Sequence, residues 1–386
     1  MKKICLIPFL CCCGLSVGWS AGLTVSGGQL MRNGTPYRAM GVNYHNCFSQ
    51  LLSNPKNRDY EKGFVILRKK YRVPFIRFMA GPFHDQGWKL YDQSPSDYFA
   101  RLDLIVHEAE KRELGLIPSL FWSVVAVPDY MNEPLSALGD ADSRSRGFIR
   151  RYATDIVTRY KDSPAVFGWE FGNEYMLFAD LPKLDHLPPP KKGTKTPRTA
   201  ADKLTRPMLL DLYEDFYRTV RSIDPERIIV TGDSIARSAA WHNSNQDCWG
   251  HDSRAQWLEQ FASDTPDCFE VASFHLYEEA DGSYFKGEKP PLGEVVAAAV
   301  QECRRNNRVV WCGELGMPGS DDYSREIFFR MMQAVEDNCI SLSAIWNFIP
   351  SGRYQPDWDI LPDHERVYML EAVRKLNDRY AVGEWK

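Results

Sequence analysis

The sequence predicts an α/β protein whose main domain is a (β/α)8 TIM barrel preceded by a short N-terminal β-hairpin. Eight short runs rich in β-branched and aromatic residues alternate with amphipathic helical segments, a pattern typical of a parallel sheet covered by helices. A chain of 386 residues also has the length at which single barrels occur. These two observations favour one large domain.

The N-terminal segment MKKICLIPFLCCCGLSVGWSAG has two lysines, an apolar run and then small residues, as signal peptides do. We assign residues 1–21 to this leader and residues 22–386 to the barrel domain. The apolar run is shorter than the ~20 residues of a membrane-spanning helix. We therefore expect a secreted or periplasmic protein without an integral membrane segment in the mature chain. Cys11, Cys12 and Cys13 raise the alternative of a lipid anchor, but no Leu-x-(Gly/Ala/Ser)-Cys box is present.

The first elements after the leader are short strands. In LTVSGGQLMRNGTPYRAMGV, apolar positions alternate around Asn33-Gly34, the dipeptide that most strongly predicts a hairpin turn. The eight barrel strands are predicted near residues 39–44, 74–79, 115–121, 165–171, 227–232, 269–275, 308–313 and 342–348.

The helices between these strands show the 3.6-residue period. One helix begins near Pro207, places Leu209, Phe216 and Val220 on one face, and ends before Asp224-Pro225. Another runs through residues 327–335. No G-x-G-x-x-G motif follows the first strand, which argues against a dinucleotide-binding fold.

One segment, residues 180–206, is rich in Pro, Lys and Thr and has no apolar period. It follows the fourth strand and would lie at the C-terminal end of the barrel, where active sites are built. Two interpretations stay open: a flexible surface insertion, or a loop that shapes a binding cleft. The cationic side chains of this segment could bind an anionic glycan. These side chains are Lys183, Lys191, Lys192, Lys195 and Arg198.

The composition excludes several classes of protein. With 44% hydrophobic and 25% charged residues and a net charge of -4, the chain resembles an ordinary globular protein, and it has no electrostatic signature of nucleic-acid binding. Outside the leader no C-x-x-C pair occurs, so we do not expect a zinc site. In an exported protein, Cys248 and Cys268 are a conceivable disulfide pair.

Two glutamates stand at the ends of predicted strands. Strand four ends in VFGWEFGNEY, which contains Asn173 and Glu174, and strand seven ends in VVWCGELG, which contains Glu314. The ends of barrel strands converge, so these carboxyl groups should lie near each other. Glycosidic cleavage needs such a pair: one acid protonates the leaving oxygen, and the other carboxylate attacks or activates water. A separation of about 5–5.5 Å gives retention and a wider one gives inversion, and the sequence leaves this open.

Motifs follow one another at the predicted strands: Arg77 in FIRF, Asn173-Glu174 in WEFGNE, His275 and Tyr277 in SFHLYE, Glu314 in CGELG, and Trp346 in AIWNF. Taken in order, these motifs resemble glycoside hydrolase family 5 of clan A over nearly the whole mature chain, and look most like its endo-β-mannanases. The resemblance implies Glu174 as acid/base and Glu314 as nucleophile of a double displacement. It further implies a β-linked polysaccharide or oligosaccharide of mannan or glucan type as substrate, with no cofactor or metal, and we expect a monomer.

The resemblance also implies roles around the glutamates. Arg77 and Tyr277 would keep Glu314 ionised, while desolvation would raise the pKa of Glu174. Asn173 would bind the sugar 2-hydroxyl. His275 would share a strand face with Tyr277. Trp346 would offer its ring for sugar stacking.

The chain departs from the family pattern at the end of strand three, where SLFWSVV has Trp122 and no histidine. The stretch GVNYHN supplies His45 and Asn46 on strand one, which could line the sugar site instead. Glu170 is expected to be a structural ion-pair member. Two alternatives stay open: an exo-acting β-glycosidase on oligosaccharides, and a carbohydrate-binding barrel without turnover.

Overall fold

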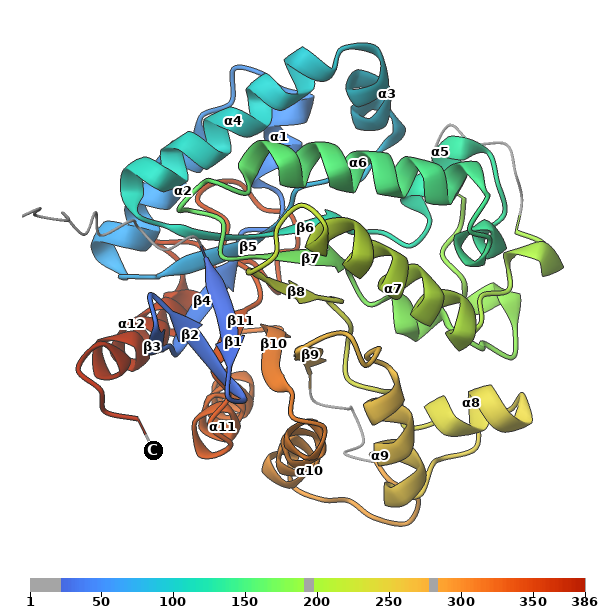
Figure 1. Cartoon of the computed structure of the whole chain (residues 1–386). Helices are drawn as coiled ribbons and strands as arrows, with labels where there is room; N and C mark the ends of the chain where they lie inside the picture. Colours follow the sequence, from blue (N-terminus) through green and yellow to red (C-terminus); the bar gives the residue numbers. More distant parts are fainter. Residues whose placement is uncertain (1–21, 191–197, 278–283, 386) are drawn as a thin grey trace, which may run out of the picture.

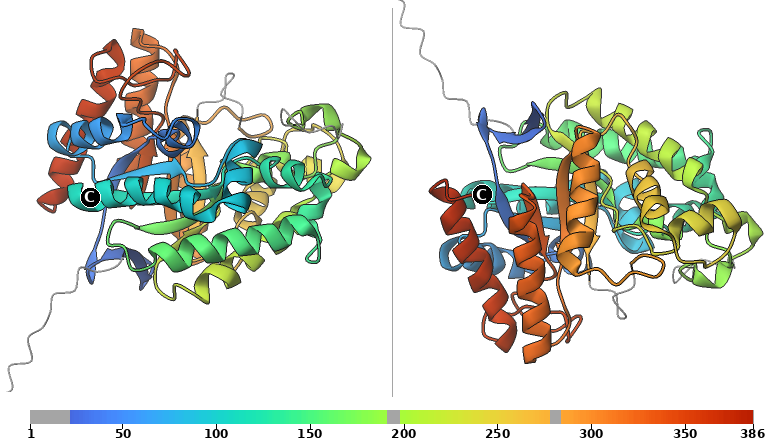
Figure 2. Two further views of the ribbon diagram at one scale, coloured as in Figure 1. Left: turned by 90° about the horizontal axis from the view of Figure 1, so that it is seen from above. Right: turned by 90° about the horizontal axis from the view of Figure 1, so that it is seen from below.

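The computed structural model describes residues 22–190, 198–277 and 284–385. In it an eight-stranded parallel sheet curls into a nearly closed barrel that helices surround (Figures 1 and 2). The strands are β4 (Ala39–Asn43), β5 (Phe75–Met79), β6 (Gly115–Phe121), β7 (Gly168–Gly172), β8 (Ile228–Val230), β9 (Val271–Leu276), β10 (Val309–Leu315) and β11 (Leu342–Ile345).

The strand order is β8-β7-β6-β5-β4-β11-β10-β9, so the first and last barrel strands, β4 and β11, pair with each other. β8 and β9 lie side by side without a ladder between them in the described part of the chain. All eight predicted strands are present. β8 and β11 are shorter than predicted because their ladders end at Val230 and Ile345, after which the chain turns into loops.

Helices cover the outside of the barrel, as the alternation predicts (Figure 1). Pro207 lies in the first turn of the helix predicted around it, and this helix ends at Arg221, before Asp224. The helices are α1 (Cys47–Ser53), α2 (Asp59–Val65), α3 (Asp85–Gln93), α4 (Pro95–Arg112), α5 (Ala126–Met131), α6 (Arg144–Tyr160), α7 (Arg206–Arg221), α8 (Ala240–Gln246), α9 (Arg254–Ser263), α10 (Leu292–Arg305), α11 (Asp322–Asp337) and α12 (Tyr368–Ala381).

The N-terminal hairpin is confirmed and is part of a small three-stranded antiparallel sheet. Its strands are β1 (Leu23–Ser26), β2 (Gln29–Arg32) and β3 (Thr35–Pro36), and the Asn33-Gly34 turn joins β2 to β3. Leu23 and Leu30 are buried in a cluster with barrel residues that include Phe75, Phe167 and Trp311. The small sheet therefore closes the N-terminal end of the barrel.

The 180–206 segment is anchored to the core at a few positions where it is described. Leu181, Leu187 and Leu204 are buried in the core. Arg198 is 10% exposed and donates to both carboxylate oxygens of Asp129, at 2.8 and 3.0 Å. Arg198 is therefore paired with Asp129 instead of being free to bind an anionic glycan. Lys191, Lys192 and Lys195 lie outside the described residues.

The conceivable Cys248–Cys268 disulfide is not formed, and both side chains are free thiols in loops on either side of α9. The leader, residues 1–21, lies outside the described residues. Among the helices that are described, none is long and apolar enough to cross a membrane.

Candidate active site

A cavity of about 830 Å³ opens where the barrel strands end. Loops after β4, β5, β10 and β11 form most of its wall, and Asn173 and Glu174 enter it from the end of β7. Asn46, Trp122, Tyr277, Glu314 and Trp346 line it as well. Within the described part of residues 180–206, no side chain belongs to this wall.

Glu314 is aimed by a β-bulge in β10. Cys312 pairs with Phe274 and Glu314 pairs with His275, so Gly313 is an extra residue without a counterpart in β9. The Gly313 carbonyl accepts a hydrogen bond from Asn43 Nδ2 at 2.9 Å, which fixes the bulge. Because a bulge redirects the following side chain, the carboxylate of Glu314 reaches the cavity from within a buried strand.

Two donors hold the Glu314 carboxylate. Arg77 Nη1 donates to Oε1 at 2.6 Å, and the Tyr277 hydroxyl donates to Oε2 at 2.5 Å. Burial, and then the neighbouring carboxylate, raise the pKa of Tyr277 well above its usual value, so the phenol keeps its proton. Both oxygens of the Glu314 carboxylate are therefore held in place at the cavity wall.

Glu174 follows β7 in a left-handed backbone conformation, with φ of 58°. Its amide donates to the Gly232 carbonyl at 3.0 Å. The next turn of chain is held by Asp233, which accepts from the Met176 amide at 2.9 Å and from the Tyr213 hydroxyl at 2.8 Å. Burial raises the pKa of Asp233 to about 6. The end of β8 therefore fixes the backbone that carries Glu174.

The Glu174 carboxyl has an environment suited to holding a proton. Burial raises its pKa above the ordinary glutamate value. Its Oε1 lies 2.9 Å from His275 Nδ1, and burial lowers the pKa of that imidazole to about 4. A neutral His275 adds no positive charge that would favour ionised Glu174.

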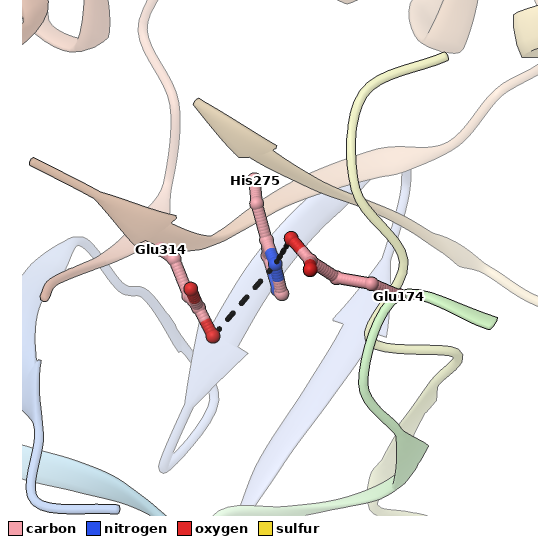
Figure 3. A group of neighbouring side chains, drawn as sticks. All are labelled: Glu174, His275 and Glu314. Carbon is pink, nitrogen blue, oxygen red and sulfur yellow. Dashed lines mark hydrogen bonds and ion pairs between the residues drawn. The ribbon is translucent and has the colours of Figure 1, made fainter. Parts of the chain in front are cut away.

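Figure 3 shows His275 lying between Glu174 and Glu314. Its Nδ1 is 3.8 Å from Glu314 Oε1. One carboxylate oxygen of each glutamate and one His275 nitrogen all lie within 4.8 Å of one another. Such a trio could in principle hold a cation, but Arg77 and Tyr277 already donate to both Glu314 oxygens. The arrangement therefore suits proton transfer and nucleophilic attack better than metal binding.

Arg77 and His275 lie beneath the cavity wall, and both are fully buried. Besides Glu314, Arg77 donates to Glu170 Oε1 at 2.7 Å and to Asn173 Oδ1 at 2.8 Å. Glu170 also accepts from Trp311 Nε1 at 3.0 Å, so it is the structural ion-pair member that its sequence position indicates. The contacts of Arg77 and His275 make them positioning residues for the two glutamates.

Aromatic rings form the floor of the cavity. Trp346 and Trp122 stack with centroids 6.0 Å apart, and His45 stacks on Trp346 at 4.9 Å. The Arg77 guanidinium lies 4.4 Å from the Trp122 ring centroid. Trp122 thus packs over Arg77 at the end of strand three, where the family pattern has a histidine.

Sequence reasoning missed the loop after β11. Tyr354, Gln355 and Trp358 line the cavity, and Gln355 Oε1 accepts from Trp346 Nε1 at 3.0 Å. Buried Asp359 fixes this loop by accepting from the amides of Tyr354 and Gln355 at 2.6 and 2.9 Å. The stretch SGRYQPDWDI could have indicated these cavity residues, because it places two aromatic residues in a loop after the eighth strand.

The barrel and its paired carboxyl groups define a candidate glycosidase of the (β/α)8 class. Residues 72–352 match the family model "Cellulase (glycosyl hydrolase family 5)", so the chain belongs to that family. All of the predicted site residues except Asn46 lie within the matched range.

Curated relatives carry mannanase names. A putative mannan endo-1,4-β-mannosidase 9 of Oryza sativa subsp. japonica is 28% identical over 179 residues, which cover 40% of this chain and 43% of the rice protein. A probable mannan endo-1,4-β-mannosidase A-2 of Aspergillus terreus is 29% identical over 161 residues, covering 39% of this chain and 33% of the fungal one. The aligned part of this chain thus spans less than half the length of each of these relatives.

A solved structure supports the fold. The endo-1,4-β-mannanase from Rhizomucor miehei superposes with a TM-score of 0.67 at 17% identity, covering 92% of this chain and 99% of that one. The prediction of a (β/α)8 barrel is confirmed.

Proposed function

We propose that the protein is a retaining glycoside hydrolase that cleaves β-linked mannan-type polysaccharides within the chain. The separation of the two carboxyl groups carries this proposal. Oxygens of Glu174 and Glu314 lie within 4.8 Å, close to the ~5–5.5 Å of retaining enzymes and below the ~6.5–9.5 Å that an inverting enzyme needs for its water.

The chemistry has two steps. In the first, a Glu314 oxygen bonds to the anomeric carbon while Glu174 gives its proton to the leaving oxygen, which departs with the bonding electron pair. In the second, Glu174, now a carboxylate, takes a proton from a water whose oxygen attacks the anomeric carbon and displaces Glu314. Asn173, held by Arg77 at 2.8 Å, is placed to bind the sugar 2-hydroxyl.

The relatives' names favour mannan over glucan as the substrate. An exo-acting enzyme needs a cleft that is closed at one end. The segment 180–206, which follows β7, is the segment that could close it. The described residues of that loop do not line the cavity, which favours endo action.

A polysaccharide panel tests the substrate. Purified protein is incubated with galactomannan, glucomannan, carboxymethyl cellulose and xylan, and released oligosaccharides are measured by mass spectrometry. We expect release of oligosaccharides from the two mannans, and none from any substrate with Glu314→Gln. Release from carboxymethyl cellulose alone would make the enzyme glucan-type, and no release from any glycan would favour the non-catalytic carbohydrate-binding barrel.

The acid role of Glu174 is tested with Glu174→Gln. This variant should lose activity on mannan, where the leaving group is poor, and largely keep the first step with activated aryl glycosides, which need no proton. An aryl glycoside that turned over no faster than mannan in this variant would contradict the assignment.

We also propose export, with cleavage after Ala21. Expression of the full chain in a bacterium, followed by N-terminal sequencing of the periplasmic fraction, should give a mature protein that begins at Gly22. Recovery only in the cytoplasm with Met1 retained would exclude the leader.

A further inference from the structure

Glu174 stands immediately before a short helical turn, η3 (Tyr175–Phe178), in the position whose side chain normally caps such a turn. A capping side chain accepts a hydrogen bond from one of the first amides of the turn, which have no partner within it. The Glu174 side chain makes no capping bond. It is directed instead at His275 (Figure 3), with Oε1 2.9 Å from His275 Nδ1, and it lines the cavity. Capping and proton transfer therefore compete for this carboxyl group.

Asp233 accepts the hydrogen bond that Glu174 leaves unmade. It follows β8, is 2% exposed, and accepts through Oδ1 at 2.9 Å from the amide of Met176, the second residue of η3. Its Oδ2 accepts at 2.8 Å from the hydroxyl of Tyr213 on α7. One carboxyl group from the neighbouring strand thus ties the first turn after Glu174 to a helix on the outside of the barrel.

The backbone of Glu174 needs this support. Its φ of 58° lies in the left-handed region, which is unfavourable for a residue with a side chain and persists only where the surroundings hold it. The Glu174 amide donates to the Gly232 carbonyl at 3.0 Å. Because Asp233 directly follows Gly232, the same short segment after β8 holds both the amide of Glu174 and the amide of Met176.

We propose that Asp233 is a positioning residue for the proton-donating step: it caps η3 in place of Glu174 and so leaves the Glu174 carboxyl group aimed at the leaving oxygen. This inference rests on the proposed function. Without the cap, the strained backbone of Glu174 would relax, and its carboxyl group would move away from the leaving oxygen or turn to cap η3 itself. A displacement of about 1 Å at a reacting group costs about a hundredfold in rate. Departure of a leaving group that needs no proton would be spared.

Two aryl β-glycosides with the same mannan oligosaccharide and different leaving groups test this role. A phenyl group needs a proton to leave, whereas a dinitrophenyl group does not. Asp233→Ala should lose about 10- to 100-fold in kcat/KM on the phenyl glycoside and less than about threefold on the dinitrophenyl glycoside. Glu174→Gln should show the same preference to a larger extent.

Asp233→Asn separates capping from other effects, because its amide oxygen can still accept from the Met176 amide. Its kcat/KM on both glycosides should stay within about threefold of wild type, since the cap is kept. An asparagine variant as impaired as the alanine variant would overturn the capping role.

Asp224→Ala is the matched control at the other end of β8. Asp224 is also 2% exposed, and it accepts from Trp169 Nε1 at 2.8 Å and from Arg227 Nη1 at 3.0 Å. Both alanine variants leave buried donors without a partner, so both should unfold at a lower urea concentration than wild type. Only Asp233→Ala should change the ratio of the two kcat/KM values, because Asp224 does not line the cavity or contact η3.

Tyr213→Phe serves as a second variant should Asp233→Ala fail to fold. It removes one of the two donors to Asp233 and keeps the buried ring, so it should shift the ratio in the same direction by about threefold. Equal losses on the two glycosides in Asp233→Ala, or in Tyr213→Phe where the alanine variant does not fold, would overturn the inference. Wild-type protein that cleaves neither mannan nor either glycoside would instead refute the proposed function.

Discussion

At the residue scale, two glutamates of identical chemistry are given different environments. Glu314 accepts hydrogen bonds from a guanidinium and a phenol, whereas Glu174 is partly buried beside an imidazole whose pKa is lowered to about 4. Groups whose surroundings push their proton affinities apart take acid and base roles in catalysis. These contacts support the proposed role of Glu174 as the acid.

The raised pKa of Glu174 predicts the alkaline side of the pH profile. Glu174 must be protonated for the first step, and burial shifts its pKa upward, so it keeps its proton to higher pH than an ordinary glutamate. Activity on mannan, measured as kcat/KM, should therefore fall as pH rises through a value above 4.5, the ordinary glutamate pKa. An activated aryl glycoside should show a much weaker alkaline fall, because its leaving group needs no proton. Identical alkaline limbs for the two substrates would contradict the role of Glu174.

Most of the site's residues could be predicted from the sequence because they stand at strand ends, where the fold dictates direction. Glu174, Glu314 and Trp346 are of this kind. Tyr354 and Asp233 were not predictable, because loop geometry and burial decide their contacts. Arg77 and His275 were placed correctly in the chain, but whether they line the cavity or support it from below depends on packing across the barrel.

At the scale of elements, the bulge in β10 is the feature on which the site depends. A side chain at Gly313 would meet His275 Nε2 at 2.7 Å and Trp311 Nε1 at 3.3 Å. The sequence predicted the strand but not the bulge, because one inserted glycine leaves the apolar run VVWCGEL intact.

Gly313→Ala should therefore displace His275 or Glu314. We expect kcat on mannan to fall by more than tenfold, with a loss of about 1–3 kcal/mol in the free energy of unfolding, as overpacked cores show. Activity assays and urea denaturation measure both effects.

Gly147→Ala is the matched control. Gly147 lies exposed in α6 with open space around its Cα, so alanine should stabilise the helix by about 0.5–1 kcal/mol and leave activity unchanged. Wild-type activity in Gly313→Ala would show that the bulge does not set the position of Glu314.

At the scale of the whole molecule, the barrel is closed at its N-terminal end by the small sheet β1–β3 and along its wall by the β4–β11 ladder. The alternation of strands and helices predicted the barrel, and the Asn33-Gly34 turn predicted the hairpin. The packing of Leu23 and Leu30 against the barrel was not predictable, because a short amphipathic hairpin does not reveal which surface it covers.

Leu23→Ala tests this closure. Removing a fully buried leucine side chain should lower the free energy of unfolding by about 2–5 kcal/mol and leave KM and kcat on mannan unchanged, because the active site is at the opposite end. Leu104→Ala, at a position 37% exposed on α4, should change stability little. A Leu23→Ala protein as stable as wild type would show that the small sheet does not seal the barrel.

The central claim, a retaining pair formed by Glu174 and Glu314, is tested most directly by the stereochemistry of the product. Proton NMR recorded during the first minutes of mannan-oligosaccharide hydrolysis distinguishes the anomer formed first from the one that later appears by mutarotation. An initial β-anomer is the result expected from glutamate oxygens that lie within 4.8 Å of each other. An initial α-anomer would mean that water attacks directly, and would contradict the nucleophilic role of Glu314.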